Sequence, residues 1–359
     1  MKISRRTRRV TAVVASMAVG IGALTGCATP GTAANDEHKL VIASPAPNSL
    51  FTFNEAVANK LGFYDDEGID VELVAISDAI PVSGLVQNRQ VDAALIAASD
   101  ALAAASKTDE LRLPYDERTG GSDFIYGIVV PEESGITSLS ELAGTNIGLA
   151  SPDQDLALLA SALPEVGLTL DDVKTTVVGA GGPSVAQSLK SGRISAFVGT
   201  IADFAAFGDA GLEVENVIPD GLQGLPVGGY IMRADALAAD DDLIKFLRAI
   251  AKGTFVALER PEVARLVTQE IDPETWREPE LAQFLLDGLS ETLVPYDTDF
   301  GVVDKDRWQD AQDLLVEVGA IADPSDIDDF LVTDLIDQIN DWDRDEVLAQ
   351  ADAWLEKNQ

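Results

Sequence analysis

Four aspartates follow predicted strands at positions where a carboxylate could contact a bound molecule. They are Asp78, Asp100, Asp153 and Asp203. A carboxylate in such a loop can accept hydrogen bonds from a cationic or N–H-bearing ligand, or it can cap the helix that follows. Capping is the commoner role for a single aspartate at such a place, and the four together leave the two roles about equally open. These positions are therefore the first candidates for noncovalent recognition.

The chain has a single cysteine, Cys27, and a single histidine, His38. One cysteine excludes a disulfide within the chain, and the two residues are too few for a zinc site built from His and Cys. Ser-His-Asp or Cys-His catalysis would need His38 as its base, and His38 falls in a predicted flexible leader. Catalysis through paired carboxylates stays open on composition alone. We expect no enzyme activity, no metal site and no cofactor.

Acidic residues outnumber basic ones by 61 to 25, which gives a formal net charge of −36. Five of the basic residues precede Cys27, where there is no acid, so the rest of the chain carries 20 basic against 61 acidic residues. A surface this anionic repels phosphate backbones and anionic lipid headgroups, which excludes nucleic acid as a partner. We interpret the charge as an adaptation for solubility or for salt.

The first 26 residues have the pattern of a bacterial lipoprotein signal peptide. Basic residues at 2–9 precede an apolar run, 10–24, that is too short to span a bilayer comfortably. The run ends in Leu-Thr-Gly-Cys, which resembles a lipobox in which Cys27 becomes the diacylated N-terminus. Residues 27–38 are small and polar, as expected of a tether. We therefore expect an exported protein that is lipid-anchored to the outer face of the bacterial cell membrane; general and twin-arginine export both stay open.

The remainder predicts alternating strands and helices, and so an α/β fold. Two β-rich runs, 69–76 and 91–96, are separated by about one helix, which favours parallel neighbours in a βαβ unit over a hairpin. The segments LVQNRQVDAAL (85–95) and SLKSGRISAF (188–197) form a weak internal repeat. From Ala236 the pattern is helical. We expect a signal peptide at 1–26, a tether at 27–38, a first lobe at 39–130, a second lobe at 131–228, a return to the first lobe at 229–300, and acidic helices packed on the first lobe at 301–359.

Four phrases, in order and at compatible spacing, resemble the NMT1/THI5-like class of periplasmic solute-binding proteins, the taurine, nitrate and pyrimidine type. They are LGFYDDEGIDVEL, GLVQNRQVDAAL, ITSLSELAGTNIGLA and AGGPSVAQSLKSGRISAFVG. The resemblance implies a type II periplasmic-binding-protein fold, with two doubly wound lobes, a cleft between them and C-terminal helices. It also implies that the protein delivers a small solute to an ABC permease with its ATPase, and we expect a monomer.

The resemblance further implies which loops form the cleft. Helix N-termini and side chains there would hydrogen-bond the solute, and closure of the lobes would expel water. The matching positions are Asn48, Phe51, Ser77, Asp78, Ser99, Asp100, Ser151, Asp153, Gln154, Gly181, Gly182, Thr200 and Asp203.

Two departures from the family bear on the solute. The chain lacks the cysteine-rich stretch of members that bind thiamin-related pyrimidines, and no Arg or Lys lies in the candidate loops, where a sulfonate or nitrate binder would favour one. We therefore favour a neutral or cationic, nitrogen-containing or heteroaromatic solute, such as a pyrimidine-type molecule. The alternatives are a sulfonate- or nitrate-type anion binder, a pyrimidine-synthesis-like enzyme of the same fold, and a ligand-sensing lipoprotein.

Overall fold

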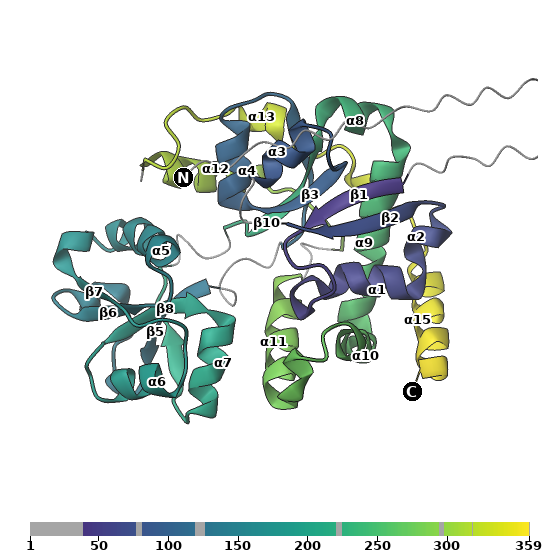
Figure 1. The fold of residues 1–359 in the computed structure, drawn as a ribbon. Coiled ribbons are helices and arrows are strands. Elements are labelled where there is room, and N and C mark those ends of the chain that lie inside the picture. Colours follow the sequence, from purple (N-terminus) through teal and green to yellow (C-terminus); the bar gives the residue numbers. More distant parts are fainter. Residues whose placement is uncertain are drawn as a thin grey trace, which may run out of the picture. The chain divides into compact units, whose positions relative to one another are not determined.

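The computed structural model describes residues 39–76, 81–118, 126–219, 225–293, 298–317 and 319–358. They form two five-stranded sheets, each with helices packed against it (Figure 1). The expected α/β class with two sheets is confirmed. Within the described part of the chain, no helix is long and apolar enough to cross a membrane.

The first sheet has the strand order β2-β1-β3-β10-β4. Its strands are β1 (Lys39–Ser44), β2 (Asp70–Ala75), β3 (Ala93–Ala97), β4 (Leu111–Asp116) and β10 (Gly228–Arg233). β1 pairs in parallel with both β2 and β3, so the two expected strands are parallel members of one sheet. The expectation that they are direct neighbours was wrong, because β1 lies between them and the connecting helix α3 (Val82–Gln87) crosses over it.

β4 was not predicted from the sequence. Pro114 stands inside it, and a proline removes one hydrogen-bond donor from a ladder, so such a run reads poorly as a strand. The sheet order gives the reason it is tolerated: β4 is the last strand of the sheet, paired only with β10 among the named strands. This strand matters below because the chain leaves it at Asp116, directly beside the candidate site.

The second sheet has the order β7-β6-β8-β5-β9. Its strands are β5 (Tyr126–Pro131), β6 (Asn146–Leu149), β7 (Lys174–Val177), β8 (Ala196–Thr200) and β9 (Val214–Asn216). β6, β7 and β8 are parallel, and β5 is antiparallel to β8. β5 thus lies in the second sheet, although its residues up to 130 were assigned to the first lobe. β10 joins the first sheet as the expected return strand, antiparallel to β3.

The predicted internal repeat is visible as two equivalent turns that lead into the central strands β3 and β8. After α3 the chain turns at Arg89 (φ 58°), and after α6 (Pro183–Lys190) it turns at Gly192 (φ 70°). In both turns an amide donates to a carbonyl five residues earlier, Gln90 to Leu85 and Arg193 to Ser188. This is a Schellman ending, which requires a left-handed residue after the helix.

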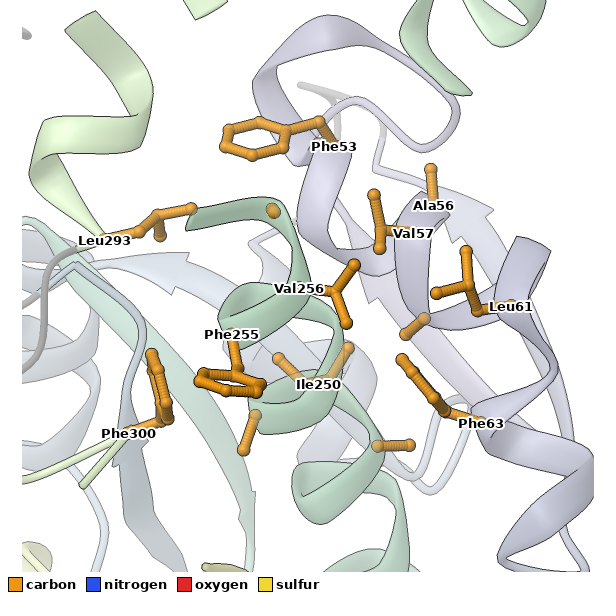
Figure 2. Close-up of a cluster of buried hydrophobic side chains, with 14 of the residues drawn as sticks. Phe53, Ala56, Val57, Leu61, Phe63, Ile250, Phe255, Val256, Leu293 and Phe300 are labelled. Atoms are coloured by element: carbon orange, nitrogen blue, oxygen red, sulfur yellow. The ribbon is translucent and has the colours of Figure 1, made fainter. Parts of the chain in front are cut away.

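Alternation along the strands of the first sheet sends successive side chains to opposite faces. Leu40 and Ile42 of β1 join the core beneath α1 (Phe53–Leu61) and α9 (Asp241–Glu259), whereas Ala43 joins the core beneath α3 and α4 (Ala98–Ala105). Figure 2 shows the first of these cores, where side chains of α1 and α9 interdigitate. Burial of each large side chain there stabilises the fold by roughly 1.5–3 kcal/mol.

The remaining helices complete the two lobes. The second lobe holds α5 (Pro152–Glu165), α6 and α7 (Ile201–Asp209). The first core includes residues of α2, α9, α10, α11 and α15, and the second includes residues of α12 and α13. Their bounds are α2 (Phe63–Asp66), α8 (Ala234–Ala239), α10 (Pro261–Ile271), α11 (Pro279–Thr292), α12 (Lys305–Glu317), α13 (Ile327–Phe330), α14 (Ile336–Ile339) and α15 (Arg344–Asn358).

Candidate functional site

A cavity of about 1030 Å³ opens at the edge of the first sheet where β1 and β3 end. Pro45 follows β1 and Ala97 ends β3, and both line it. In open α/β sheets this carboxyl edge of the strands is where ligands bind. The walls are mostly apolar, and among the described residues the charged ones that line the cavity are Asp100, Lys107, Glu117 and Arg118.

Among the predicted site residues that the structure describes, Asp100 is the one that lines this cavity. It lies in the first turn of α4, is exposed, and has no hydrogen bond or ion pair among the described residues. The helix begins at Ala98, and its N-cap residue, Ala97, offers no side-chain cap. Asp100 therefore does not act as the cap that was weighed as its alternative role, and its carboxylate is available to a ligand. Ser99 is exposed beside it but is not among the lining residues.

Arg118 was missed because it follows β4 and lies outside the candidate loops, in which the sequence has no Arg or Lys. It follows the unpredicted strand β4, is only 7% exposed, and lines the cavity together with Glu117. Its Nε lies 3.2 Å from a carboxylate oxygen of Glu117, its Nη1 donates to Thr292 Oγ1 (2.9 Å), and its Nη2 donates to the carbonyl of Phe51 (2.6 Å). A charge cluster, Asp116-Glu117-Arg118, directly after the alternating run 111–115 was the signal in the sequence.

The loop before α1 contributes to this region differently from what was expected. Asn48 was expected to contact the ligand, but in this loop it is Ser49 whose hydroxyl accepts from the Phe51 amide at the start of a short 3₁₀ helix, Leu50–Thr52. Asn48 instead takes a left-handed conformation (φ 60°) in the preceding turn. Phe51 is 44% exposed, and its backbone carbonyl rather than its ring is tied to Arg118. Neither Asn48 nor Phe51 lines the cavity.

Two further acids, Glu55 and Asp116, are buried next to the Glu117–Arg118 ion pair. Glu55 on α1 is fully buried and accepts hydrogen bonds from Ser44 Oγ (2.9 Å), at the end of β1, and from the Tyr230 hydroxyl (2.6 Å). Burial raises the pKa of Glu55 from its ordinary 4.5 to about 7, against the lowering effect of these hydrogen bonds. Burial also raises the pKa of Asp116 to about 7, although the Trp308 indole N–H donates to it (3.0 Å).

Asn54 connects the ion pair to the core. Its amide nitrogen donates to Glu117 Oε1 (3.3 Å) and to Thr254 Oγ1 (3.2 Å) of α9. Its own oxygen Oδ1 is buried without a hydrogen-bond partner among the described residues. The Glu117 carboxylate is thereby held from both sides, by Asn54 and by Arg118, which fixes the guanidinium at the cavity wall.

In the second lobe, three predicted site residues, Gly181, Thr200 and Asp203, lie together, but they form hydrogen bonds with one another. Asp203 accepts from the Thr200 amide (2.7 Å) and hydroxyl (3.0 Å), the capping box of α7, and from the Gly181 amide (2.5 Å). Gly181 is needed there because a Cβ atom would lie 2.6 Å from Asp203 Cα. Gly182 precedes α6 without a side-chain cap. For Asp203, then, the capping role is the one the structure shows.

A second buried acid of this lobe, Asp155, was missed. It is fully buried in α5 and accepts from the Ser151 amide (2.7 Å) and from the Tyr126 hydroxyl. Burial raises the pKa of Asp155, and burial with the neighbouring carboxylates raises that of Tyr126. Ser151 was predicted as a ligand contact, and the structure places its backbone amide on Asp155. In the sequence, Asp155 stands in the run Asp-Gln-Asp at 153–155, which does not single it out.

Several predicted positions are not tested. Cys27, Ser77 and Asp78 lie outside the described residues. For Asp153 and Gln154 only the backbone, in the first turn of α5, is described. Ile76 and Pro81, on either side of Ser77 and Asp78, both line the cavity.

Comparisons with known proteins agree with this architecture. The profile described as "NMT1/THI5 like" matches residues 52–264. A search among curated protein sequences finds no match. The periplasmic aliphatic sulphonate binding protein SsuA from Escherichia coli is 16% identical, with a TM-score of 0.63 over 82% of this chain and 92% of that chain.

A putative periplasmic sulfonate-binding protein SsuA of a sulfonate ABC transporter, from Methylobacillus flagellatus KT, is 18% identical, with a TM-score of 0.61 over 85% of this chain and 94% of that one. The desulfurization enzyme DSZB, solved as a C27S mutant with biphenyl-2-sulfinic acid, has a TM-score of 0.57 at 15% identity over 84% of this chain and 98% of that one. At these identities the structural matches establish the fold, and that fold serves both binding proteins and an enzyme.

Proposed function

The chain belongs to the NMT1/THI5-like family, and we propose that it is the solute-binding component of an ABC importer. It captures a small solute between two closing lobes and delivers it to a permease with its ATPase. It is exported and held at the outer face of the bacterial membrane by lipid on Cys27. The similar structures that are periplasmic binding proteins of sulfonate ABC transporters support this class of role.

One observation carries the proposal. The cavity at the carboxyl edge of β1 and β3 combines Asp100, an acid without a partner in the described part of the chain, with a buried, fixed guanidinium, that of Arg118. A free carboxylate and a rigid cation on a mostly apolar wall are what a site needs to orient a small polar molecule. Asp100 differs in this from Asp203, whose carboxylate accepts hydrogen bonds from within the protein.

The favoured solute is a neutral or cationic, nitrogen-containing or heteroaromatic compound of the pyrimidine type. Asp100 and Glu117 on the cavity wall support this assignment. A second candidate is an anion of the sulfonate or nitrate type. Arg118 and Lys107 on the same wall favour it, as do the sulfonate-binding proteins among the similar structures.

An enzyme of this fold is the alternative from another class, since DSZB shares the architecture. A pyrimidine-synthesis-like activity that depends on a histidine would have to use His38, the only one in the chain, which precedes the first strand. A ligand-sensing lipoprotein would bind its solute in the same cavity and would differ only in its partner. A neighbouring gene for a permease favours transport, and one for a kinase or cyclase favours sensing.

Thermal unfolding of the purified protein against a broad set of small metabolites tests the binding role. Because a ligand that binds only the native state raises the melting temperature, a solute present at about 100 times its Kd stabilises the protein by about 2.7 kcal/mol. We expect one chemical class to produce the shift. A broad set that produces no shift contradicts the proposal.

Metabolic labelling with a radioactive fatty acid tests the anchor. The wild-type protein should incorporate the label and remain with the membrane, whereas Cys27→Ser should lose it because the thiol is the only one in the chain. Labelling of the Cys27→Ser protein would refute the lipid anchor and leave the binding role standing.

A further inference from the structure

We infer that a groove between α7 and α11 binds an organic cation with a hydrocarbon body. The groove is a cavity of about 480 Å³, and residues of β5 and β9 complete its wall. Among the described residues, none that lines this groove also lines the cavity at the carboxyl edge of the first sheet. The inference therefore concerns a second site and goes beyond the proposed function.

The groove results from the way the two helices meet. A Cβ atom at Gly288 of α11 would collide with the Cδ1 atom of Ile201 of α7, so the helices are in close contact there. Away from this contact, residues three or four positions apart on each helix line the cavity: Phe204 and Gly208 on α7, and Leu281 and Phe284 on α11. Positions at this spacing lie on one face of a helix, so each helix turns an apolar face to the cavity.

The wall of the groove is apolar and partly exposed to solvent. Phe284 is 49% exposed, and Phe204 and Leu281 on the same wall are half-buried. Exposed apolar side chains that gather around a hollow indicate an interaction site, whereas single ones do not. A volume of about 480 Å³ lies in the range of about 300–1,000 Å³ that is usual for small-molecule sites. The hydrocarbon part of a ligand fits this space and removes the two phenylalanine rings from water.

The charge of the groove selects a cation. Among the described residues, the charged ones that line it are Glu213 and Glu280, and both are exposed. Neither carboxylate forms a hydrogen bond or ion pair with a described residue. An ammonium group is attracted by such carboxylates and also by the faces of aromatic rings, here those of Phe204 and Phe284. The first cavity differs in this respect, because two basic side chains line it as well.

Acidic residues are common in this chain, so two carboxylates alone do not indicate a site. Their place on the wall of an apolar cavity is the additional observation. The overall charge also argues against a second copy of the chain as the occupant. Beyond residue 26 each copy carries 61 acidic and 20 basic residues, so two copies repel one another, whereas a small cation is attracted.

The test measures the binding of four probes to the purified protein by calorimetry, in about 0.15 M salt so that the long-range field is screened. 4-Phenylbutylamine carries both the cation and the hydrocarbon body. 4-Phenylbutanol and 4-phenylbutyrate keep the body without the cation, and ethylamine keeps the cation without the body. We expect the phenylbutylamine to bind about tenfold more tightly than each of the other three.

A pair of double variants tests whether the carboxylates of the groove hold the cation. Glu213→Gln with Glu280→Gln should weaken the phenylbutylamine about fivefold. Glu215→Gln with Glu291→Gln is the matched control, because Glu215 lies in β9 and Glu291 in α11, both are exposed, and neither lines the groove. The control removes the same total charge and should leave the affinity unchanged.

A filling variant tests whether the groove itself is the site. An added Cβ atom at Gly208 meets nothing within 4 Å, and Gly208 lines the cavity. Gly208→Phe should therefore place a ring in the groove and abolish the binding of the phenylbutylamine without a loss of thermal stability. Leu170→Phe is the control, since Leu170 is 39% exposed and does not line the groove.

The inference is overturned if the alcohol binds as tightly as the amine, or if Gly208→Phe folds and still binds the amine. It is also overturned if Asp100→Asn abolishes amine binding, since the cation then lies in the first cavity and the proposed function stands. A dimer that Phe284→Ala dissociates would show that a second copy covers the groove. Amine binding that Gly208→Phe abolishes and Asp100→Asn leaves intact supports the inference, whatever the metabolite screen shows for the proposed function.

Discussion

The two sheets present the same topological edge, but they use their acids in different ways. At the edge of the second sheet, the carboxylates of Asp203 and Asp155 accept backbone amides, at 2.5 Å from Gly181 and 2.7 Å from Ser151. At the edge of the first sheet, Asp100 accepts from no described residue. An aspartate in a loop is therefore available to a ligand only where the neighbouring backbone does not already occupy it.

The lobes also differ in how they carry buried charge. The first lobe gathers Glu55, Asp116 and Glu117 around Arg118, all at most 7% exposed. The second lobe buries Asp155 and Asp203 without a basic partner among the described residues and relies on N–H and O–H donors. The first arrangement depends on one cation, whereas the second is spread over several hydrogen bonds.

Removal of that cation should have the largest effect on stability. Arg118→Met leaves Glu117 buried with an uncompensated charge, so we expect a loss of about 3–5 kcal/mol in the free energy of unfolding, measured by urea titration. Lys107→Met is the matched control, since Lys107 lines the same cavity but is exposed, and it should change stability by less than about 0.5 kcal/mol. Equal losses for the two variants would mean that the buried cluster does not depend on its cation.

The buried Glu55 should make stability depend on pH. Its pKa is raised by folding from 4.5 to about 7, so its stabilising contribution is complete below pH 4.5 and is lost as the pH rises through 7. Glu55→Gln keeps the neutral form at every pH, so this variant should gain stability over the wild type by about 2.5 kcal/mol between pH 5 and pH 8.

Urea titrations of both proteins at the two pH values provide this measurement. Glu67→Gln is the contrasting control, because the Glu67 carboxylate pairs with Arg248 (2.8 Å) and Lys252 (2.5 Å), and the loss of its charge should cost stability at both pH values. A difference between Glu55→Gln and the wild type that stays constant with pH would contradict the assignment of a neutral Glu55 at pH 5.

The contrast between the two edges predicts a smaller effect, a difference in the free energy of unfolding between Asp203→Ala and Asp100→Ala. Asp203→Ala removes the acceptor for Thr200 and Gly181 and should cost about 2 kcal/mol. Asp100→Ala removes no hydrogen bond to a described residue and should stay within about 0.5 kcal/mol of the wild type. Chemical unfolding of both variants measures these changes. A comparable loss of stability in Asp100→Ala would show that Asp100 is structural as well.

The sequence predicted the architecture better than the site. The β-rich runs at 69–76 and 91–96 and the repeated strand entry at 85–95 and 188–197 are local patterns, and both were recovered. Strand β4 was not predicted because Pro114 stands inside it, and Arg118, which follows β4, was therefore missed as well. Glu55 and Asn54 stand inside the pattern of an ordinary amphipathic helix, and only the packing of α1 against α9 turns them inward. Which acid becomes a cap depends on backbone geometry that spacing alone does not contain.

Calorimetric titration of three proteins with the best-binding compound of the screen tests the central claim most directly: the wild type, Asp100→Asn and Asp203→Asn. If the edge of the first sheet recognises the solute, Asp100→Asn should bind it at least tenfold more weakly, whereas Asp203→Asn, although less stable, should bind within about threefold of the wild type. Undiminished binding by Asp100→Asn together with a large loss for Asp203→Asn would contradict the account and move recognition to the second lobe.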